Sequence, residues 1–252
     1  MRVARLLQHL VEPPRPCSYL GDRRASLEYR LMVDVTPAEL EALLERGWRR
    51  FGPAYFRPAC APCGDCIALR IPVARFAPSR AQRRALRARA AFRAVVGPVR
   101  VDAARLDLYA RWHADREQKR RWEPSPVDGE EYVTSFGFPH PCAREVAYYA
   151  DDGVGEGSAP RLVGVGLCDE TARAWSATYF FYDPAYASYS PGVLHVLNLA
   201  RMARDQGKAH VYLGFLINDC ASMRYKARFR PHELLVGRPD MDEPPSWRLD
   251  PP

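Results

Sequence analysis

The chain has 252 residues, of which 47% are hydrophobic and 27% are charged, a composition typical of a globular protein with one or two domains. It is basic, because 37 Lys and Arg outnumber 30 Asp and Glu, giving a net charge of +7 and a pI near 9.1. No run approaches the roughly 20 apolar residues that cross a bilayer, and charges interrupt the opening segment, so we expect a cytoplasmic protein without a membrane partner.

Capping signals place the first helices. Thr36, Pro37 and Glu39 form the pattern of a capping box with proline at the first helical position, and Ser79 is a second candidate N-cap. Apolar and aromatic runs between turns indicate strands. The predicted strands of this part are 27–35, 54–57 and 67–73, and the predicted helices are 36–47 and 79–92.

The second half of the chain alternates strands with longer helices. Helices are predicted at 103–120, 191–205 and 220–226, strands at 148–150, 162–168, 174–182 and 210–217, a proline-rich loop at 123–142 and a glycine-rich turn at 151–160. Two strands, a long helix entered through a tight turn, a further strand and a helix resemble the central part of the GNAT (acyl-CoA N-acyltransferase-like) fold. We expect an α+β protein with a small cysteine-containing N-terminal α/β domain at 1–98, a GNAT-like domain at 99–238 and a disordered tail at 239–252.

The first candidate functional feature is a basic helix face. Arg80, Arg83, Arg84 and Arg87 follow the spacing i, i+3, i+4, i+7, with no acidic residue between Arg80 and Arg93. Like charges at this spacing repel each other, which favours a polyanion as the missing counter-charge. The alternative is a solvated helix face in which arginine reflects a GC-rich genome.

The second feature is a cysteine cluster. Cys60, Cys63 and Cys66 are spaced as two consecutive Cys-x-x-Cys steps, with Cys17 upstream as a possible fourth ligand. Thiols at this spacing suit zinc or an iron–sulfur cluster. The alternative is a turn of small residues with reduced thiols.

The third feature is the last predicted strand together with the basic and aromatic residues that follow it. The aromatic strand from Tyr212 is followed by Arg224, Tyr225 and Lys226, which would lie at the carboxyl end of that strand, where α/β sheets commonly carry their sites. A surface helix anchored by apolar residues explains the same pattern.

Five dispersed stretches together resemble the arginyl-tRNA–protein transferase family, and most closely its bacterial branch, the aspartate/glutamate leucyltransferases. They are CSYLGDRRA (17–25), LLERGWRRFGPAYFRPACAPCGDC (43–66), RIPVARFAPSRAQRRALR (70–87), YFFYDPAYASYSPGV (179–193) and YLGFLINDCASMRYKARFRPHELL (212–235). The region 102–160 matches least clearly.

The resemblance implies an enzyme that moves leucine from leucyl-tRNA to proteins that begin with Asp or Glu, marking them for degradation in the N-degron pathway. Its partners would be an aminoacyl-tRNA and these acceptor proteins. Arginyl-tRNA is the alternative donor, and it would need an acidic pocket, for which Asp169, Glu170 and Asp183 are candidates. No cofactor is required, because the aminoacyl ester is already activated. In the eukaryotic branch the N-terminal cysteines are associated with an iron–sulfur cluster; this chain matches the context of Cys17 but spaces the other three differently.

Roles for individual residues follow as expectations. The tyrosines Tyr179, Tyr182 and Tyr225 are candidates to hydrogen-bond the acceptor amine or the ester carbonyl. The acceptor carboxylate requires a cation, for which the candidates are Arg224, Lys226 and Arg230, followed by Arg49, Arg50 and Arg57. The tRNA would be held by Arg80, Arg83, Arg84 and Arg87, and by Ser190 and Gly192 at a helix entry where backbone N–H groups are free.

Two other functions are compatible with parts of the pattern. An acetyl-CoA-dependent acetyltransferase would fit the fold, but Pro191 removes one backbone donor from the turn that would bind the pyrophosphate. A non-catalytic, metal-stabilised RNA-binding module would explain the basic helix and the cysteines, and leaves the arrangement after residue 160 without a role.

Overall fold

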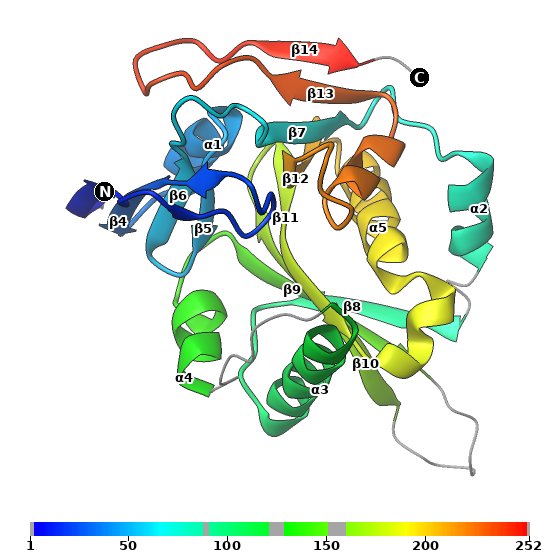
Figure 1. Ribbon diagram of the computed structural model, residues 1–252. Helices are drawn as coiled ribbons and strands as arrows, with labels where there is room; N and C mark the ends of the chain where they lie inside the picture. Colours follow the sequence, from blue (N-terminus) through cyan, green and yellow to red (C-terminus); the bar gives the residue numbers. More distant parts are fainter. Residues whose placement is uncertain (1–2, 88–90, 121–128, 151–159, 251–252) are drawn as a thin grey trace.

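The computed structural model describes residues 3–87, 91–120, 129–150 and 160–250, and shows a mixed α+β protein built on two main sheets (Figure 1). The smaller sheet has the order β1-β4-β6-β5 and is antiparallel. Its strands are β1 (Arg5–Val11), β4 (Leu27–Val33), β5 (Arg49–Phe51) and β6 (Ala54–Pro58), and a two-stranded ribbon of β2 (Arg15–Pro16) and β3 (Arg24–Ala25) lies between β1 and β4 in the chain.

Helix α1 (Pro37–Glu45) closes the smaller sheet. The predicted capping box is present: Thr36 accepts a hydrogen bond from the backbone of Glu39, whose carboxylate accepts one from the backbone of Thr36. Leu40, Leu43 and Leu44 of this helix are buried in one cluster with residues of both sheets. The smaller sheet is therefore packed against the larger one.

The larger sheet has eight strands in the order β14-β13-β7-β12-β11-β10-β9-β8. The strands are β7 (Ile67–Pro72), β8 (Arg93–Gly97), β9 (Ala143–Ala150), β10 (Arg161–Glu170), β11 (Ala174–Tyr182), β12 (His210–Leu216), β13 (His232–Leu235) and β14 (Trp247–Asp250). Every neighbouring pair is antiparallel except β11 and β12, which run parallel. This parallel pair is joined by a helix, as a crossover connection requires.

Helices cover both faces of the larger sheet (Figure 1). Helix α5 (Pro191–Asp205) buries Leu194, Leu197 and Leu199 on one face, and α3 (Ala103–Arg120) buries Leu108 and Tyr109 on the other. Helix α2 (Arg80–Arg87) packs against α5. The remaining helical segments are α4 (Gly129–Tyr132), the π-helical turn η2 (Val133–Gly137) and the 3-10 segments η3 (Pro184–Tyr189) and η4 (Arg224–Arg228). No helix in the described ranges has the length and apolar character to span a bilayer.

Several sequence expectations are corrected. Residues 247–250 form β14 where a disordered tail was expected, because they pair with β13 and the Trp247 indole donates to the backbone of Glu45 at 3.0 Å. β7 and β8 precede residue 98 yet belong to the larger sheet, so no sheet boundary lies at that residue. The predicted loop 123–142 contains α4 and η2, and the helix predicted at 220–226 is the shorter η4. The glycine-rich turn at 151–160 lies, apart from its last residue, outside the described residues.

Candidate active site

A gap between the two parallel strands creates the site. β11 and β12 are paired only from Ala174–His210 to Ser176–Tyr212, and both strands then continue apart. A bulge in β12 next to Gly214, whose φ of +75° favours glycine, accompanies the separation. Arg49 from β5 binds the β11 side of the gap: its guanidinium donates to Ser176 Oγ at 2.7 Å and to the carbonyl of Ala177.

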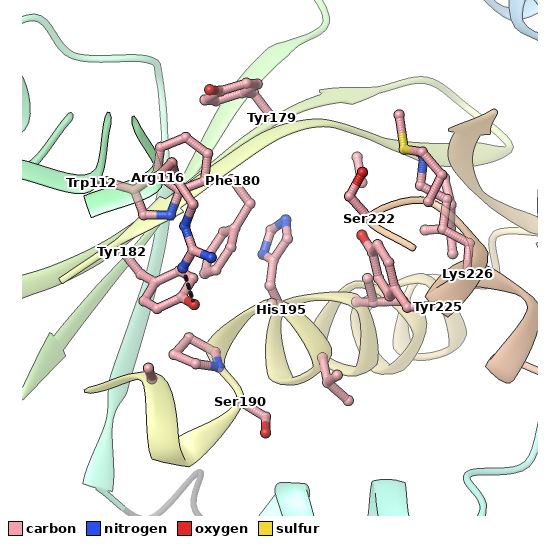
Figure 2. Close-up of a pocket in the computed structure, with 18 of the residues that line it drawn as sticks. Trp112, Arg116, Tyr179, Phe180, Tyr182, Ser190, His195, Ser222, Tyr225 and Lys226 are labelled. Atoms are coloured by element: carbon pink, nitrogen blue, oxygen red, sulfur yellow. Dashed lines mark hydrogen bonds between the residues drawn. The ribbon is translucent and has the colours of Figure 1, made fainter. Parts of the chain in front are cut away.

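A pocket of about 670 Å³ opens beside this gap (Figure 2). Its walls come from β11, β12, the start of α5, η4, α3 and the loop that carries Tyr19. Apolar and aromatic side chains such as Trp112, Phe180, Val196 and Leu213 form much of the surface. Among the described residues no Asp or Glu lines the pocket, and its two cations are Arg116 and Lys226.

Lys226 lies at one side of the pocket next to the gap. Its ammonium nitrogen donates to the carbonyl of Phe215 at 2.8 Å and lies 3.3 Å from the sulfur of Met223. Burial, followed by the positive charge of Arg49, lowers the pKa of Lys226 from 10.5 to about 7. A lysine with this pKa is present in both protonation states near neutral pH, which suits proton transfer.

His195 forms the centre of the pocket floor (Figure 2). Its ring stacks on Phe180 with centroids 4.7 Å apart, and Nδ1 lies 2.9 Å from the hydroxyl of Tyr148. Burial lowers the pKa of His195 to about 3, so the imidazole is neutral at physiological pH. It therefore contributes a fixed polar surface and no charge between the two cations.

Gly166 of β10 makes room for His195, and this gives a stability prediction. A Cβ at position 166 would lie 2.1 Å from Cε1 of the His195 ring, which is held by Phe180 and Tyr148. We expect Gly166→Ala to lower the free energy of unfolding by about 3 kcal/mol, through overpacking. Gly164→Ala is the matched control two residues away, because its Cβ would meet its nearest neighbours at 3.6 Å. Urea unfolding of both variants checks this, and equal losses at the two glycines would contradict it.

Arg116 lies at the other side of the pocket from Lys226 in Figure 2. Its guanidinium stands over the rings of Trp112 and Tyr182, 5.4 Å and 5.6 Å from the two centroids, and donates to the Tyr182 hydroxyl at 2.8 Å. This hydroxyl is thereby placed on the pocket wall. The pocket thus contains two separate cationic groups, one on α3 and one on η4.

The predicted tyrosines and helix entry all reach this pocket. Tyr179, Tyr182 and Tyr225 line it, as do Ser190 and Gly192 at the start of α5. The hydroxyl of Tyr179 lies 3.1 Å from Nε2 of His113, inside an aromatic cluster with Tyr109 and Phe136. Burial raises the pKa of Tyr179 well above its usual range, so it stays protonated.

The predicted acceptor-binding cations are mostly used elsewhere. Arg50 is buried against Asp169, and Arg57 bonds Glu28 and Asp240 and stands 4.7 Å from the ring centre of Trp48. These two side chains do not line this pocket. A further three of the set also lie outside the pocket lining: Arg49 is buried behind the gap, Arg224 is exposed and Arg230 pairs with Asp250 at 3.1 Å. Lys226 is the member of the set that lines the pocket.

The predicted basic face is exposed on α2. Arg80, Arg83, Arg84 and Arg87 all face solvent, while Gln82 on the opposite side is buried and donates to the carbonyl of Arg228 at 3.0 Å. Ser79 caps the helix, because its hydroxyl accepts from the backbone of Gln82 and its backbone donates to the Gln82 side chain. The helix is thereby joined to η4, the segment that carries Lys226.

The four candidate cysteine ligands are all free thiols of intermediate exposure. The thiol of Cys60 donates to the carbonyl of Ser26, and the thiol of Cys63 donates to Asp65. Burial raises the pKa of the Cys66 thiol to about 12, with smaller contributions in the same direction from the neighbouring Cys60, Cys17 and Cys63. In the described ranges no three Cys, His, Asp or Glu side chains stand close enough to share an ion, and a metal site at these cysteines stays a prediction.

Many pocket residues were absent from the sequence-based set, among them Tyr19, Trp112, Arg116, Thr178, His195 and Ser222. One pair had a readable signal, since Trp112 and Arg116 are four residues apart on a correctly predicted helix and so share one face. His195 had none, because a histidine on an apolar helix face is ordinarily a core residue. The place of His195 in the pocket depends on Gly166 of β10, which makes room for its ring.

Comparison with known proteins agrees with this architecture. The family model for the N terminus of arginine-tRNA-protein transferase matches residues 15–84, and the model for its C terminus matches residues 104–236. An aspartate/glutamate leucyltransferase of Helicobacter hepaticus is 35% identical over 92% of this chain and 94% of its own length. One of Halorhodospira halophila is 36% identical over 88% of this chain and 91% of its own.

Solved structures with some likeness are more distant. The C-terminal domain of a putative lysylphosphatidylglycerol synthetase from Agrobacterium fabrum has a TM-score of 0.46 at 11% identity, covering 85% of this chain and 64% of that one. FemX has a TM-score of 0.45 at 11% identity, covering 72% and 60%. The two family models and the full-length relatives decide the assignment: this chain belongs to the arginine-tRNA–protein transferase family of aminoacyl-tRNA-dependent enzymes.

Proposed function

We propose that this protein transfers leucine from leucyl-tRNA to the N-terminal Asp or Glu of acceptor proteins, the activity that the names of its full-length relatives state. The observation that carries the leucine assignment is the pocket itself, which is apolar and free of acidic side chains among the described residues. An apolar pocket suits a leucyl side chain, whereas an arginyl group would require a buried carboxylate. As a reaction of charged tRNA it would take place in the cytoplasm and supply the N-degron pathway.

The acidic residues considered for an arginyl pocket are held in other contacts. Asp169 pairs with Arg50, and Glu170 pairs with Arg144 at 3.1 Å. Asp183 accepts from Arg111 at 2.8 Å and from the backbone of Ala185 at the start of η3. None of the three lines the pocket, which favours leucyl-tRNA over arginyl-tRNA as the donor.

We further propose that β9 to β12, α3 and α5 form a GNAT-like transferase domain, and that β1 to β6 with α1 and the cysteines form a smaller N-terminal domain. Two features support the first assignment. The parallel strands β11 and β12 separate after a short paired stretch, and α5 and α3 pack on opposite faces of the sheet that contains them. Pro191 at the first position of α5 lacks an N–H, which argues against a pyrophosphate of coenzyme A at this turn.

The proposed reaction is one acyl transfer. The lone pair of the acceptor α-amine attacks the ester carbonyl, and neutral Lys226 accepts the proton that the amine loses. The bond between the carbonyl carbon and the ribose oxygen then breaks, and the ribose oxygen takes the proton from Lys226. A peptide bond and uncharged tRNA result. Positioning of amine and ester in one pocket would supply a large part of the acceleration. Tyr182 and Tyr225, which line the pocket, are proposed to hydrogen-bond the reacting groups.

The direct test is a transfer assay with purified protein. tRNA charged with radiolabelled leucine or arginine is offered in parallel, together with peptides that begin with Asp, Glu or Ala. We expect leucine to enter the Asp and Glu peptides alone. Movement of arginine would overturn the donor assignment, and no transfer from either tRNA would overturn the function. No metal enters the proposed step; a zinc or iron–sulfur site at the cysteines stays a prediction that elemental analysis of the same sample checks.

The exposed face of α2 is proposed to bind tRNA phosphates, which predicts a changed salt dependence. Replacing Arg80, Arg84 and Arg87 by glutamine removes up to three phosphate contacts, so the slope of log affinity against log salt is expected to fall by about 2 to 3. Binding of leucyl-tRNA is measured between 50 and 300 mM salt. The control replaces the exposed arginines Arg5, Arg23 and Arg173 in the same way. If the slope of log affinity against log salt is equal in the two triple variants, the arginines of α2 contribute only through the net charge of the protein and do not contact phosphates directly.

A further inference from the structure

We propose that Arg116 binds the side-chain carboxylate of the acceptor's N-terminal Asp or Glu and so determines acceptor specificity. This inference rests on the proposed transfer reaction and assigns one of its two substrates to one side of the pocket. It adds a residue that was absent from the sequence-based set, in place of Arg50 and Arg57, which are bonded elsewhere.

The free hydrogen-bonding capacity of Arg116 is the first observation. Its side chain is 13% exposed, so the guanidinium is largely withdrawn from water. Within the described residues its one hydrogen bond goes to the Tyr182 hydroxyl, and its Nε is buried without a hydrogen-bond partner. A guanidinium has five N–H donors in a planar fork that matches a carboxylate. Because Nε is buried beside Asp115, the donors that remain for a ligand are the N–H groups of the two terminal nitrogens that Tyr182 does not use.

The charge balance around Arg116 is the second observation. The nearest carboxylate, Asp115, lies 3.7 Å from Nε, beyond hydrogen-bonding distance, and its other oxygen is 2.6 Å from Lys119. No acidic side chain of the described residues lines the pocket to compete for the guanidinium. An anionic ligand would thus supply the counter-charge that Arg116 lacks on its pocket side.

The place of Arg116 inside the pocket favours a carboxylate over the tRNA backbone. The rings of Trp112 and Tyr182 lie beside the guanidinium and hold its planar fork in position. Polyanionic tRNA is bound through many phosphates, and the exposed arginines of α2 offer the extended surface for them. Arg116 is a single cation inside the pocket, where it would meet one group of one substrate.

The position of Lys226 completes the assignment. Lys226 and Arg116 lie on opposite sides of His195 (Figure 2), so the pocket can hold the acceptor amine near one cation and its carboxylate near the other. Lys226 is partly neutral near pH 7 and is a poor anchor for an anion. Arginine keeps its charge and binds carboxylates with two hydrogen bonds, and its long side chain can reach both Asp and Glu.

The test compares acceptor peptides that differ by charge alone. kcat and KM are measured for peptides beginning with Asp, Asn, Glu or Gln, with the wild type, Arg116→Gln and Arg116→Lys. For Arg116→Gln we expect KM for the Asp and Glu peptides to rise about 10- to 100-fold, and the preference for Asp over Asn to fall at least tenfold. Arg116→Lys keeps the charge without the fork and should give an intermediate preference.

The outcomes separate this inference from the proposed function. Arg201→Gln is the control, because it removes an exposed arginine of α5 that pairs with Asp205 outside the pocket lining, and its preference should equal that of the wild type. Affinity for leucyl-tRNA is measured in each variant and should be unchanged. A wild type that transfers leucine beside an Arg116→Gln variant with an unchanged Asp over Asn preference would overturn the inference alone. If activity falls equally with all four acceptor peptides and leucyl-tRNA binds more weakly, Arg116 binds the leucyl-tRNA donor instead. Absence of transfer by the wild type would overturn the proposed function.

Discussion

Replacing Lys226 by methionine is expected to lower kcat by about 10²- to 10⁴-fold, the usual contribution of a proton-transfer group. The physical reason is that Lys226 is the pocket residue whose pKa, about 7, allows it to take a proton from the attacking amine and return it to the ribose oxygen. Affinity for leucyl-tRNA should be retained. The measurement is single-turnover transfer to an Asp peptide at saturating enzyme.

The same substitution is expected to stabilise the protein. The folded pKa of Lys226 lies below its ordinary value of 10.5, so between about pH 7 and 10.5 the unfolded chain binds more protons than the folded one. Stability of the wild type therefore rises with pH through this window, and the cost of the buried charge is fully present below pH 7. After loss of the hydrogen bond to Phe215 is subtracted, we expect Lys226→Met to gain about 2 kcal/mol at pH 6. At pH 10.5 the buried charge no longer costs stability, so only the lost hydrogen bond remains and the variant should be about 1 kcal/mol less stable than the wild type.

Lys226→Arg distinguishes proton transfer from simple charge. Arginine keeps a cation at this place but does not give up its proton, so turnover should stay low. In the wild type, log kcat/KM should rise with pH with a slope of about two below pH 7, since both Lys226 and the α-amine must lose a proton, and the variant should show a slope of about one. An active Lys226→Arg enzyme with the wild-type slope would show that Lys226 only binds an anion.

Arg50→Ala is expected to lower the free energy of unfolding by about 3–5 kcal/mol, because it leaves the carboxylate of Asp169 buried without its partner. Both side chains are almost fully buried, and Nε of Arg50 donates to Asp169 at 2.9 Å. The remaining folded enzyme should have an unchanged KM for Asp peptides, since Arg50 is not in the pocket lining. Chemical denaturation and acceptor kinetics at low temperature measure the two effects.

Two comparisons support the interpretation of that result. Arg144→Ala breaks the neighbouring pair with Glu170, which is more exposed, and should cost less than about 1 kcal/mol. The double variant Arg50→Met with Asp169→Leu removes both charges together and should recover much of the lost stability. A raised KM for acidic peptides in Arg50→Ala, with stability unchanged, would instead restore Arg50 as an acceptor-binding residue.

Elements with their own local signals were predictable. The capping box of Thr36 and the N-cap Ser79 placed the starts of α1 and α2, and the apolar runs between turns placed β10, β11 and β12. The predicted 79–92 helix was too long, because α2 ends at Arg87 and β8 begins at Arg93. β14 was missed, since a short strand is stabilised by its partner: Trp247 packs on Arg70, 4.2 Å from the ring centre, across more than 170 residues of chain.

The candidate site likewise contains residues that the sequence indicated and residues that only the folded structure identifies. Lys226, Tyr182, Ser190 and Gly192 had separate expected roles that followed from the family resemblance, and the structure places all four at one pocket. Charge by itself did not distinguish Arg50 and Arg57 from Arg116, because the three have the same chemistry. What separates them is whether a carboxylate from a distant segment lies within hydrogen-bonding distance, as Asp169 and Glu28 do.

The sequence by itself determined the family, the helices with caps, the central strands and the presence of an excess of arginine, since each depends on residue identity and spacing along the chain. The tertiary structure alone decided which cations are free, where the parallel strands separate, why residue 166 must be glycine, and that Lys226 has a pKa near 7. These properties depend on burial and on contacts between segments far apart in the chain, and both arise only when the chain is folded.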